Sequence, residues 1–200
     1  MVLLETFVNK IAAISILASH ILLAVFLLFF VYVKFLKKEL SPYWQEVWEF
    51  IEKNSLLFAF LMVTGGTFGS LVYSEILKLP PCDLCWLQRV FIYPQVIILG
   101  VALWKKQRDI FDYVIGLNVI GLVFAIYQYT MQMINYSGPC PIGFGTASCF
   151  TKDVFEFGYI TIPLMSLTLM VFLIILTYIS KQSGKREKVS KENIQRIEEE

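Results

Sequence analysis

Long apolar runs separated by short polar segments dominate the sequence. Five of these runs reach the roughly 20 residues that a helix needs to cross the hydrocarbon core of a bilayer. They are Ile11–Val33, Leu56–Leu77, Trp86–Trp104, Ile110–Ile134 and Gly158–Ile179. None of them alternates apolar and polar residues as a transmembrane β-strand does. The pattern therefore predicts an all-α membrane protein with five spanning helices.

The composition supports the same class of protein. Of the 200 residues, 57% are hydrophobic and 16% are charged, whereas soluble domains have about 45–50% apolar and about 25% charged residues. The chain has too little polar surface to cover itself in water, which excludes a soluble enzyme and a disordered protein. The net charge of +1 supplies no basic surface, so we expect the lipid bilayer and no nucleic acid among its partners.

The basic residues predict the orientation, because cytoplasmic loops of membrane proteins are rich in Lys and Arg. Thirteen of the seventeen Lys and Arg residues follow the first, third or fifth run: Lys34, Lys37, Lys38, Lys53, Lys105, Lys106, Arg108, Lys181, Lys185, Arg186, Lys188, Lys191 and Arg196. Only three lie in the alternate segments. This asymmetry predicts a multi-pass protein of the cell membrane, with the N-terminus outside and the C-terminus in the cytoplasm.

Three segments follow from this pattern. Residues 1–54 hold the first run, which we expect to be a retained anchor because it exceeds the apolar core of about 7–15 residues in a signal peptide. They also hold Ser41–Asn54, where a cap, a proline and aromatic residues at helical spacing predict a cytoplasmic interfacial helix. Residues 55–180 hold the other four runs, and residues 181–200 form a charged cytoplasmic tail.

Cysteines carry the candidate chemistry. Cys82 and Cys85 form a CxxC motif after Pro81, and a proline cannot continue a preceding helix but can begin a new one. We therefore expect this pair in the first turn of the third span, where the helix dipole stabilises a thiolate. A CxxC pair can close a small disulfide ring whose redox properties depend on its surroundings.

Two polar residues share the helix face of Cys85, since Gln88 lies three and Arg89 four residues after it. A charged side chain inside a span is costly and is therefore a functional candidate. Beside a redox cysteine, a guanidinium would stabilise negative charge on a carbonyl oxygen of a lipid-soluble electron acceptor. The alternative is an arginine whose long side chain reaches the outer headgroups.

The second pair, Cys140 and Cys149, lies in a loop rich in glycine and proline between the fourth and fifth runs. Such a loop has no regular structure, and an exposed disulfide across it is open to attack by a thiolate. A purely structural disulfide is the alternative. The predicted orientation places both pairs on the extracytoplasmic face, where disulfides are favoured over zinc thiolates, so we expect no metal.

Further polar residues lie inside the predicted spans. His20, the only histidine, lies in the first span, and Asn118, Gln128 and Gln132 lie in the fourth. Inside a membrane such side chains form hydrogen bonds between helices, which is the role we expect for the three residues of the fourth span, and for His20 we expect packing or such a hydrogen bond. Contact with an electron acceptor or a proton path is the alternative for the three residues of the fourth span.

Taken together, these motifs resemble the DsbB/BdbC family of disulfide bond formation proteins. The resemblance is carried by CDLCWLQR at Cys82–Arg89, by Tyr93-Pro94, by the second cysteine pair one helical hairpin later, and by GYITIPLMSL at Gly158–Leu167. It covers Leu56–Ile179 and implies a four-helix transmembrane bundle of DsbB type, to which this chain adds one N-terminal transmembrane helix. It also implies an oxidoreductase that reoxidises a DsbA-like thioredoxin-fold thiol oxidase and passes the electrons to a membrane quinone, either ubiquinone or menaquinone.

The resemblance also implies roles for the candidate residues. Cys140 would join the partner in a mixed disulfide, with Cys149 as its resolving cysteine. Cys82 and Cys85 would form the quinone-linked pair, with Cys85 nearest the ring. Arg89 would hold the quinone oxygen, and Gln88 matches the motif beside it. The chain departs from the family in its added N-terminal segment and in the short loop between Cys140 and Cys149, which restricts how far the loop can swing toward the first pair.

Other classes of protein make different predictions. A VKOR-like quinone-linked thiol oxidoreductase has its loop cysteines before the CxxC motif, the reverse of the order here. A reductase of the CcdA type needs cysteines that are reachable from the cytoplasm, which the predicted orientation does not supply. A non-catalytic membrane scaffold with two structural disulfides would bind no quinone and would stay oxidised beside a reduced thioredoxin-fold protein.

Overall fold

A computed structural model describes residues 2–36, 42–105, 110–141 and 148–198. Its elements are α1 (Val2–Leu36), α2 (Pro42–Leu71), the π-helical turn η1 (Val72–Ile76), α3 (Asp83–Lys105), α4 (Phe111–Met133) and α5 (Ile162–Glu198). Within these residues the only β pairing is a single bridge between Glu156 and Ile160. Five helices are long and apolar enough to cross a membrane, which confirms the predicted all-α membrane fold.

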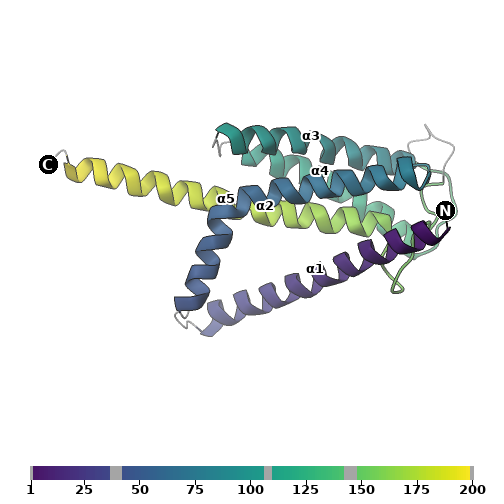
Figure 1. Ribbon diagram of the computed structural model, residues 1–200, viewed down its shortest axis with the longest axis horizontal. Coiled ribbons are helices and arrows are strands. Elements are labelled where there is room, and N and C mark those ends of the chain that lie inside the picture. Colours follow the sequence, from purple (N-terminus) through teal and green to yellow (C-terminus); the bar gives the residue numbers. More distant parts are fainter. Residues whose placement is uncertain (1, 37–41, 106–109, 142–147, 199–200) are drawn as a thin grey trace.

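Four of the helices form a bundle in which α2 and α4 each pack against both α3 and α5 (Figure 1). Small and aliphatic side chains from all four helices fill its centre: Ala59, Val63, Ile92, Leu99, Val114, Ala125, Met170 and Leu173. α4 packs closely on α5 at Gly121, where an added Cβ atom would lie 2.6 Å from Met170 Cε. The predicted four-helix bundle is therefore present.

A buried amide pair joins α3 to α4 inside this bundle. Asn118 Nδ2 donates to Gln95 Oε1 at 2.8 Å, and Gln95 Nε2 donates to Asn118 Oδ1 at 3.2 Å. Both side chains are fully buried. The hydrogen bond between helices predicted for Asn118 is confirmed.

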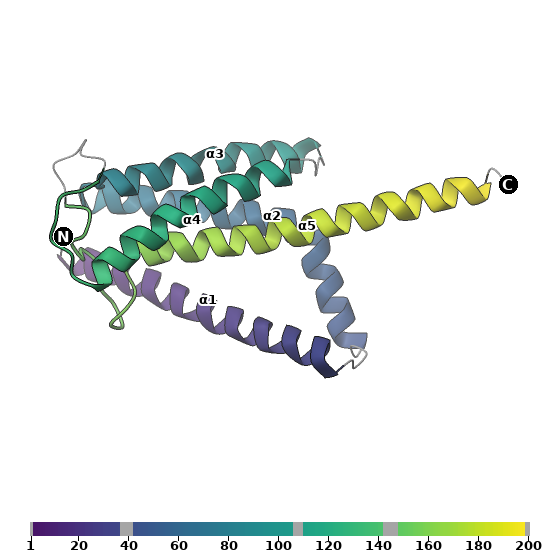
Figure 2. The same cartoon turned by 180° about the vertical axis from the view of Figure 1, so that it is seen from behind.

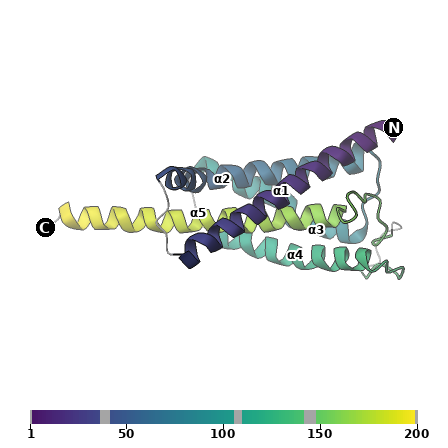
Figure 3. The ribbon, with the colours of Figure 1, turned by 90° about the horizontal axis from the view of Figure 1, so that it is seen from below.

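The additional helix α1 lies outside the bundle. It packs on α5 beside the cysteine-bearing end, crosses the bundle obliquely (Figure 3) and diverges from α5 toward its own C-terminal end (Figure 2). His20 Nε2 lies 2.9 Å from Thr168 Oγ1, and His20 Nδ1 lies 3.4 Å from the Tyr159 hydroxyl. Of the two roles expected for His20, packing or a hydrogen bond between helices, these contacts confirm the hydrogen bond.

Three helices extend well beyond the apolar runs that predicted them, and the first of these, α1, begins at Val2 rather than at Ile11. α2 begins at Pro42 and continues into the second run, so the expected interfacial segment and the second span form one helix, whose first part stands out sideways from the bundle (Figure 1). α5 begins at Ile162 rather than at Gly158, because Phe157 and Gly158 have positive φ angles of 51° and 78°. It then continues through residue 180 to Glu198, so the expected segment borders fall inside continuous helices.

Candidate redox site

The CxxC pair lies where α3 begins. Cys82 immediately precedes the helix and Cys85 lies in its first turn, with the two Sγ atoms 2.7 Å apart. The backbone N–H of Cys85 also donates to Cys82 Sγ at 3.3 Å. The side-chain hydrogen bond with Cys85, together with burial, raises the pKa of the Cys82 thiol above its ordinary value. Cys82 is therefore the member of the pair that holds its proton.

The loop cysteines lie against the same helix end. Cys140 and Cys149 form a disulfide, and Cys82 and Cys85 are free. Both pairs belong to one apolar cluster: Cys82, Leu84, Cys149 and Phe150 are buried, and Cys85, Phe124, Met131 and Cys140 pack against them. The short loop was expected to restrict its swing toward the first pair, but the structure already holds the two pairs together.

Gln128 of α4 connects the two pairs. Its Nε2 donates to the carbonyl oxygen of Cys149 at 3.0 Å and to Cys82 Sγ at 3.2 Å. Its Oε1 accepts a hydrogen bond of 2.8 Å from Gln88 Nε2. The expected bond between helices is confirmed for Gln128, but its contact with both cysteine pairs was not predicted, because it depends on how the loop folds back over α4.

Gln132 lies one turn further along α4 and holds the same loop. Its Nε2 donates to the backbone carbonyl of Thr151 at 2.9 Å. The expected bond to another helix is therefore wrong for Gln132, because the loop passes over this end of α4. Gln128 and Gln132 together fix the loop segment that carries Cys149.

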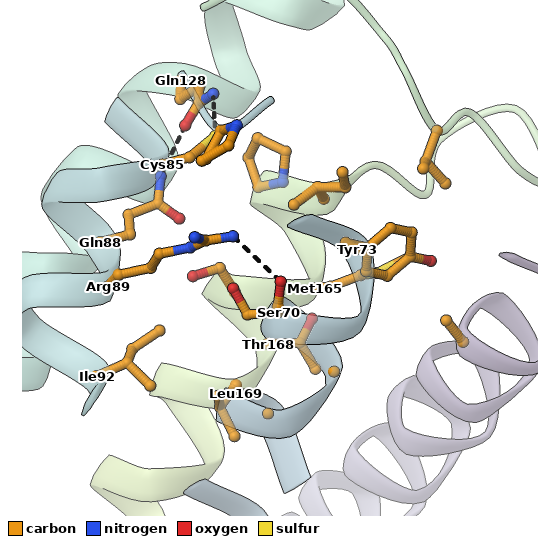
Figure 4. Close-up of a pocket in the computed structure, with 18 of the residues that line it drawn as sticks. Ser70, Tyr73, Cys85, Gln88, Arg89, Ile92, Gln128, Met165, Thr168 and Leu169 are labelled. Atoms are coloured by element: carbon orange, nitrogen blue, oxygen red, sulfur yellow. Dashed lines mark hydrogen bonds between the residues drawn. The ribbon is translucent and has the colours of Figure 1, made fainter. Parts of the chain in front are cut away.

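Arg89 points into the bundle rather than toward the end of its helix (Figure 4). Its Nη2 donates to the backbone carbonyl of Ser70 on α2 at 3.1 Å. The guanidinium carbon also lies 5.1 Å from the centre of the Trp86 ring and 5.9 Å from that of Tyr93. Among the described residues Arg89 forms no ion pair. Its positive charge is held by neutral partners and faces the interior, unlike an arginine that reaches for headgroups.

A cavity of about 450 Å³ lies in front of these side chains (Figure 4). α3 contributes Cys85, Gln88 and Arg89 to its wall, and Cys82 and Gln128 border it as well. α2 lines it with Leu61, Met62, Gly65, Gly66, Gly69 and Ser70, η1 adds Tyr73, and α5 adds Met165, Ser166, Thr168 and Leu169 among others. No earlier prediction included the α2 wall. The available signal was three glycines within residues 65–69 of an apolar run, which remove side chains from that stretch of helix.

One group of acidic and sulfur ligands occurs in the described part of the chain. The carboxylate of Asp83 and the sulfurs of Cys140 and Cys149 lie within 4.8 Å of one another. Zinc binds cysteine as a thiolate, and these two sulfurs are joined in a disulfide. The group is therefore not arranged as a zinc site while the disulfide is closed.

Comparison with known proteins identifies the family. The sequence profile described as "Disulfide bond formation protein DsbB" matches residues 52–180. This chain belongs to the DsbB family. It is 38% identical over 141 residues to the "Probable disulfide formation protein C 2" of Bacillus cereus, covering 70% of this chain and 99% of that protein. It is 45% identical over 115 residues to the "SPbeta prophage-derived disulfide bond formation protein B" of Bacillus subtilis, covering 57% of this chain and 76% of that protein.

A relative from outside the genus Bacillus has a similar level of identity. The "Probable disulfide formation protein" of Coxiella burnetii is 38% identical over 138 residues, which cover 67% of this chain and 94% of that protein. No solved structure matches the chain at a comparable level of significance. All four cysteines and Arg89 lie within the segment that matches the DsbB profile, whereas α1 lies outside it. The chain is therefore a multi-pass membrane disulfide bond formation protein with an added helix.

Proposed function

We propose that this DsbB-family protein is a quinone-dependent thiol oxidase that reoxidises a DsbA-like thioredoxin-fold partner. One observation carries the proposal: a single cavity is bordered by Cys85 and by the unpaired charge of Arg89, while the Cys140–Cys149 disulfide packs against the same CxxC pair. This arrangement provides a route from the loop to the cavity. The relatives are named for disulfide formation, and the acceptor and the partner are our inference.

The residues around the cavity are suited to a quinone. Arg89 would hold one carbonyl oxygen, and Cys85 would face the ring. The hydroxyls of Tyr73 and Ser166 also line the cavity, are buried and have no hydrogen-bond partner among the described residues, so they would serve the second oxygen. When bound, the quinone supplies an acceptor for two electrons and two protons.

The first exchange takes place at the loop disulfide. A thiolate of the partner attacks Cys140 Sγ, the bond to Cys149 breaks, and the electron pair leaves on the Cys149 sulfur. The second partner thiolate then attacks the partner's own sulfur in the mixed disulfide, which closes the partner disulfide and leaves Cys140 reduced. The loop dithiol next reduces the Cys82–Cys85 disulfide and becomes a disulfide again. The arrangement described here, with the loop pair oxidised and the CxxC pair reduced, corresponds to this stage.

The second exchange oxidises the CxxC pair. Cys85, as the thiolate, gives up two electrons toward the cavity, and Cys82 attacks its sulfur to close the Cys82–Cys85 disulfide. The two thiol protons leave with the electrons, so the net reaction converts partner dithiol and quinone into partner disulfide and quinol. Arg89 stabilises the negative charge that develops on the acceptor oxygen. The distribution of Lys and Arg supports an extracytoplasmic location for this end of the bundle.

Substitution of Arg89 tests the proposal. In purified protein with a reduced thioredoxin-fold protein and quinone, Arg89→Ala is expected to lower quinol formation by about 100-fold, the usual loss when one donor to a developing oxyanion is removed. Lys105→Ala, at the far end of the same helix, is the matched control and should retain wild-type turnover. Cys82→Ser should abolish quinol formation.

Two outcomes would contradict the proposal. Unchanged turnover and quinone affinity in Arg89→Ala would remove Arg89 from the acceptor site. Cysteines that stay oxidised in the wild-type protein, with no quinol formed, would instead indicate a membrane scaffold with structural disulfides. The quinol absorbance of the same mixture distinguishes the two results.

A further inference from the structure

The residues of α1 that line the cavity are mostly small. They are Ala12, Ser15, Ile16 and Ser19, which recur at spacings of three and four and therefore share one face of the helix. Large apolar residues occupy the opposite side, where Ile14 and Ile21 are 57% and 58% exposed. Figure 4 shows α1 across the cavity from the α3 wall that bears Arg89. The helix thus turns its least bulky face to the cavity.

Two sets of contacts hold α1 in this place. Ala13 is fully buried against Ile160 and Leu164, and Ile16 and Leu17 pack around them. Beyond this apolar contact, His20 bonds to two α5-side hydroxyls. The Thr168 hydroxyl already donates to Leu164 O at 2.8 Å, so it accepts from His20 Nε2–H, and the Tyr159 hydroxyl donates to His20 Nδ1.

The α2 wall that also faces this space contains three glycines beside the larger Leu61 and Met62. Added Cβ atoms at Gly65 and Gly69 would meet nothing within 4 Å. The part of the cavity away from Cys85 is therefore bordered by small residues of α1, by glycines and two large apolar residues of α2, and by apolar residues of α5. A flexible apolar chain attached to an electron-accepting ring fits this part, because the ring alone needs only the end that holds Cys85 and Arg89.

We propose that α1 is the fifth wall of the acceptor site and that its small face binds the prenyl chain of the quinone, so that this helix makes the protein selective for prenylated acceptors. The inference rests on the proposed function, since it concerns the same cavity. It gives a role to the helix that lies outside the segment matched by the family profile, residues 52–180. His20 acts as a positioning residue that keeps α1 against α5.

A matched pair of substitutions in full-length protein in lipid nanodiscs tests the wall. Ala12→Leu fills the cavity face, whereas Ala18→Leu adds the same atoms on the exposed face. The probes are one quinone ring with a prenyl chain and the same ring without it. Ala12→Leu should lower kcat/KM for the prenylated quinone about tenfold, as overpacking of a close-fitting site does, and leave the ring-only quinone unchanged. Ala18→Leu should change neither value.

The positioning role of His20 has its own readout. His20→Phe keeps the ring but removes both hydrogen bonds, and Thr168→Val removes one acceptor. Each should reduce the preference for the prenylated quinone, and the double variant should lose no more than His20→Phe alone because both act on one contact. Photolabelling with a quinone that carries an azide on its chain should modify the tryptic peptide of residues 11–34 in the wild-type protein and lose that label in Ala12→Leu.

The results separate this inference from the proposed function. If the wild-type protein reduces quinone but Ala12→Leu matches Ala18→Leu and the 11–34 peptide carries no label, α1 is not a wall of the site. If the wild-type protein reduces neither quinone, the proposed function fails and the selectivity of α1 fails with it. An equal loss for both quinones in Ala12→Leu would also overturn the inference, because it would place α1 at the ring rather than at the chain.

Discussion

Replacing Gln128 by Leu would test how the two cysteine pairs are held together. Leu has nearly the volume of Gln, so the substitution leaves little cavity, and the side chain is only 1% exposed. It would lose the bonds to the Cys149 carbonyl, to Cys82 Sγ and from Gln88. The Cys149 carbonyl and the Gln88 amide would remain buried without this partner. Each such group costs about 1–3 kcal/mol, so the free energy of unfolding should fall by about 2–6 kcal/mol.

The effect on electron transfer between the pairs should be larger than the effect on stability. Gln128 fixes Cys149 relative to Cys82, and misplacing reacting groups by about 1 Å can cost about 100-fold in rate. The assay mixes quinone-free protein with a reduced thioredoxin-fold protein, quenches with acid and measures the reduced fraction of Cys82 and Cys85 by alkylation and mass spectrometry. The transfer should slow by about 10- to 100-fold.

Gln132→Leu is the matched control for this experiment. It removes one bond to the same loop, at the Thr151 carbonyl, without touching a cysteine. It should lower the free energy of unfolding by about 1–2 kcal/mol and slow the transfer less than Gln128→Leu does. The reasoning would be refuted if Gln128→Leu were no more destabilising than Gln132→Leu, or if it transferred electrons to the CxxC pair as fast as the wild-type protein.

Two further predictions concern the bundle and the CxxC pair. Gly121→Ala should destabilise the protein by about 1–3 kcal/mol in SDS titration, because its Cβ would lie 3.2 Å from Phe91 Cβ and 2.6 Å from Met170 Cε. The control Gly116→Ala should not destabilise the protein, because an added Cβ there meets nothing within 4 Å. Equal stabilities of the two variants would argue against close packing around Gly121. In the reduced protein, iodoacetamide should modify Cys82 only at a higher pH than an ordinary cysteine, because the raised pKa keeps Cys82 in the unreactive thiol form. Peptide mass spectrometry that finds Cys82 modified before Cys85 would contradict this.

Much of the fold could be predicted from the local pattern of apolar and polar residues. Apolar runs of membrane-spanning length specify helices, because backbone groups in a bilayer must bond within their own segment. Pro81 and the CxxC spacing likewise place Cys82 and Cys85 at the start of α3. The helix ends were less well predicted. Residues 54 and 180 lie inside continuous helices, since a change from apolar to polar composition does not by itself end a helix.

At the candidate site, the difference between what the sequence predicts and what only the tertiary structure decides is clearer still. The identity of its chemical groups, four cysteines and an arginine in a span, could be read from the sequence alone, because thiol spacing and the cost of a buried charge are local properties. The tertiary structure alone decided that Gln128 bridges the two cysteine pairs, that the Ser70 carbonyl accepts a hydrogen bond from Arg89 and that α1 lines the cavity. Each of these contacts joins segments that are far apart in the sequence, and helix periodicity specifies a face without specifying which neighbour it meets.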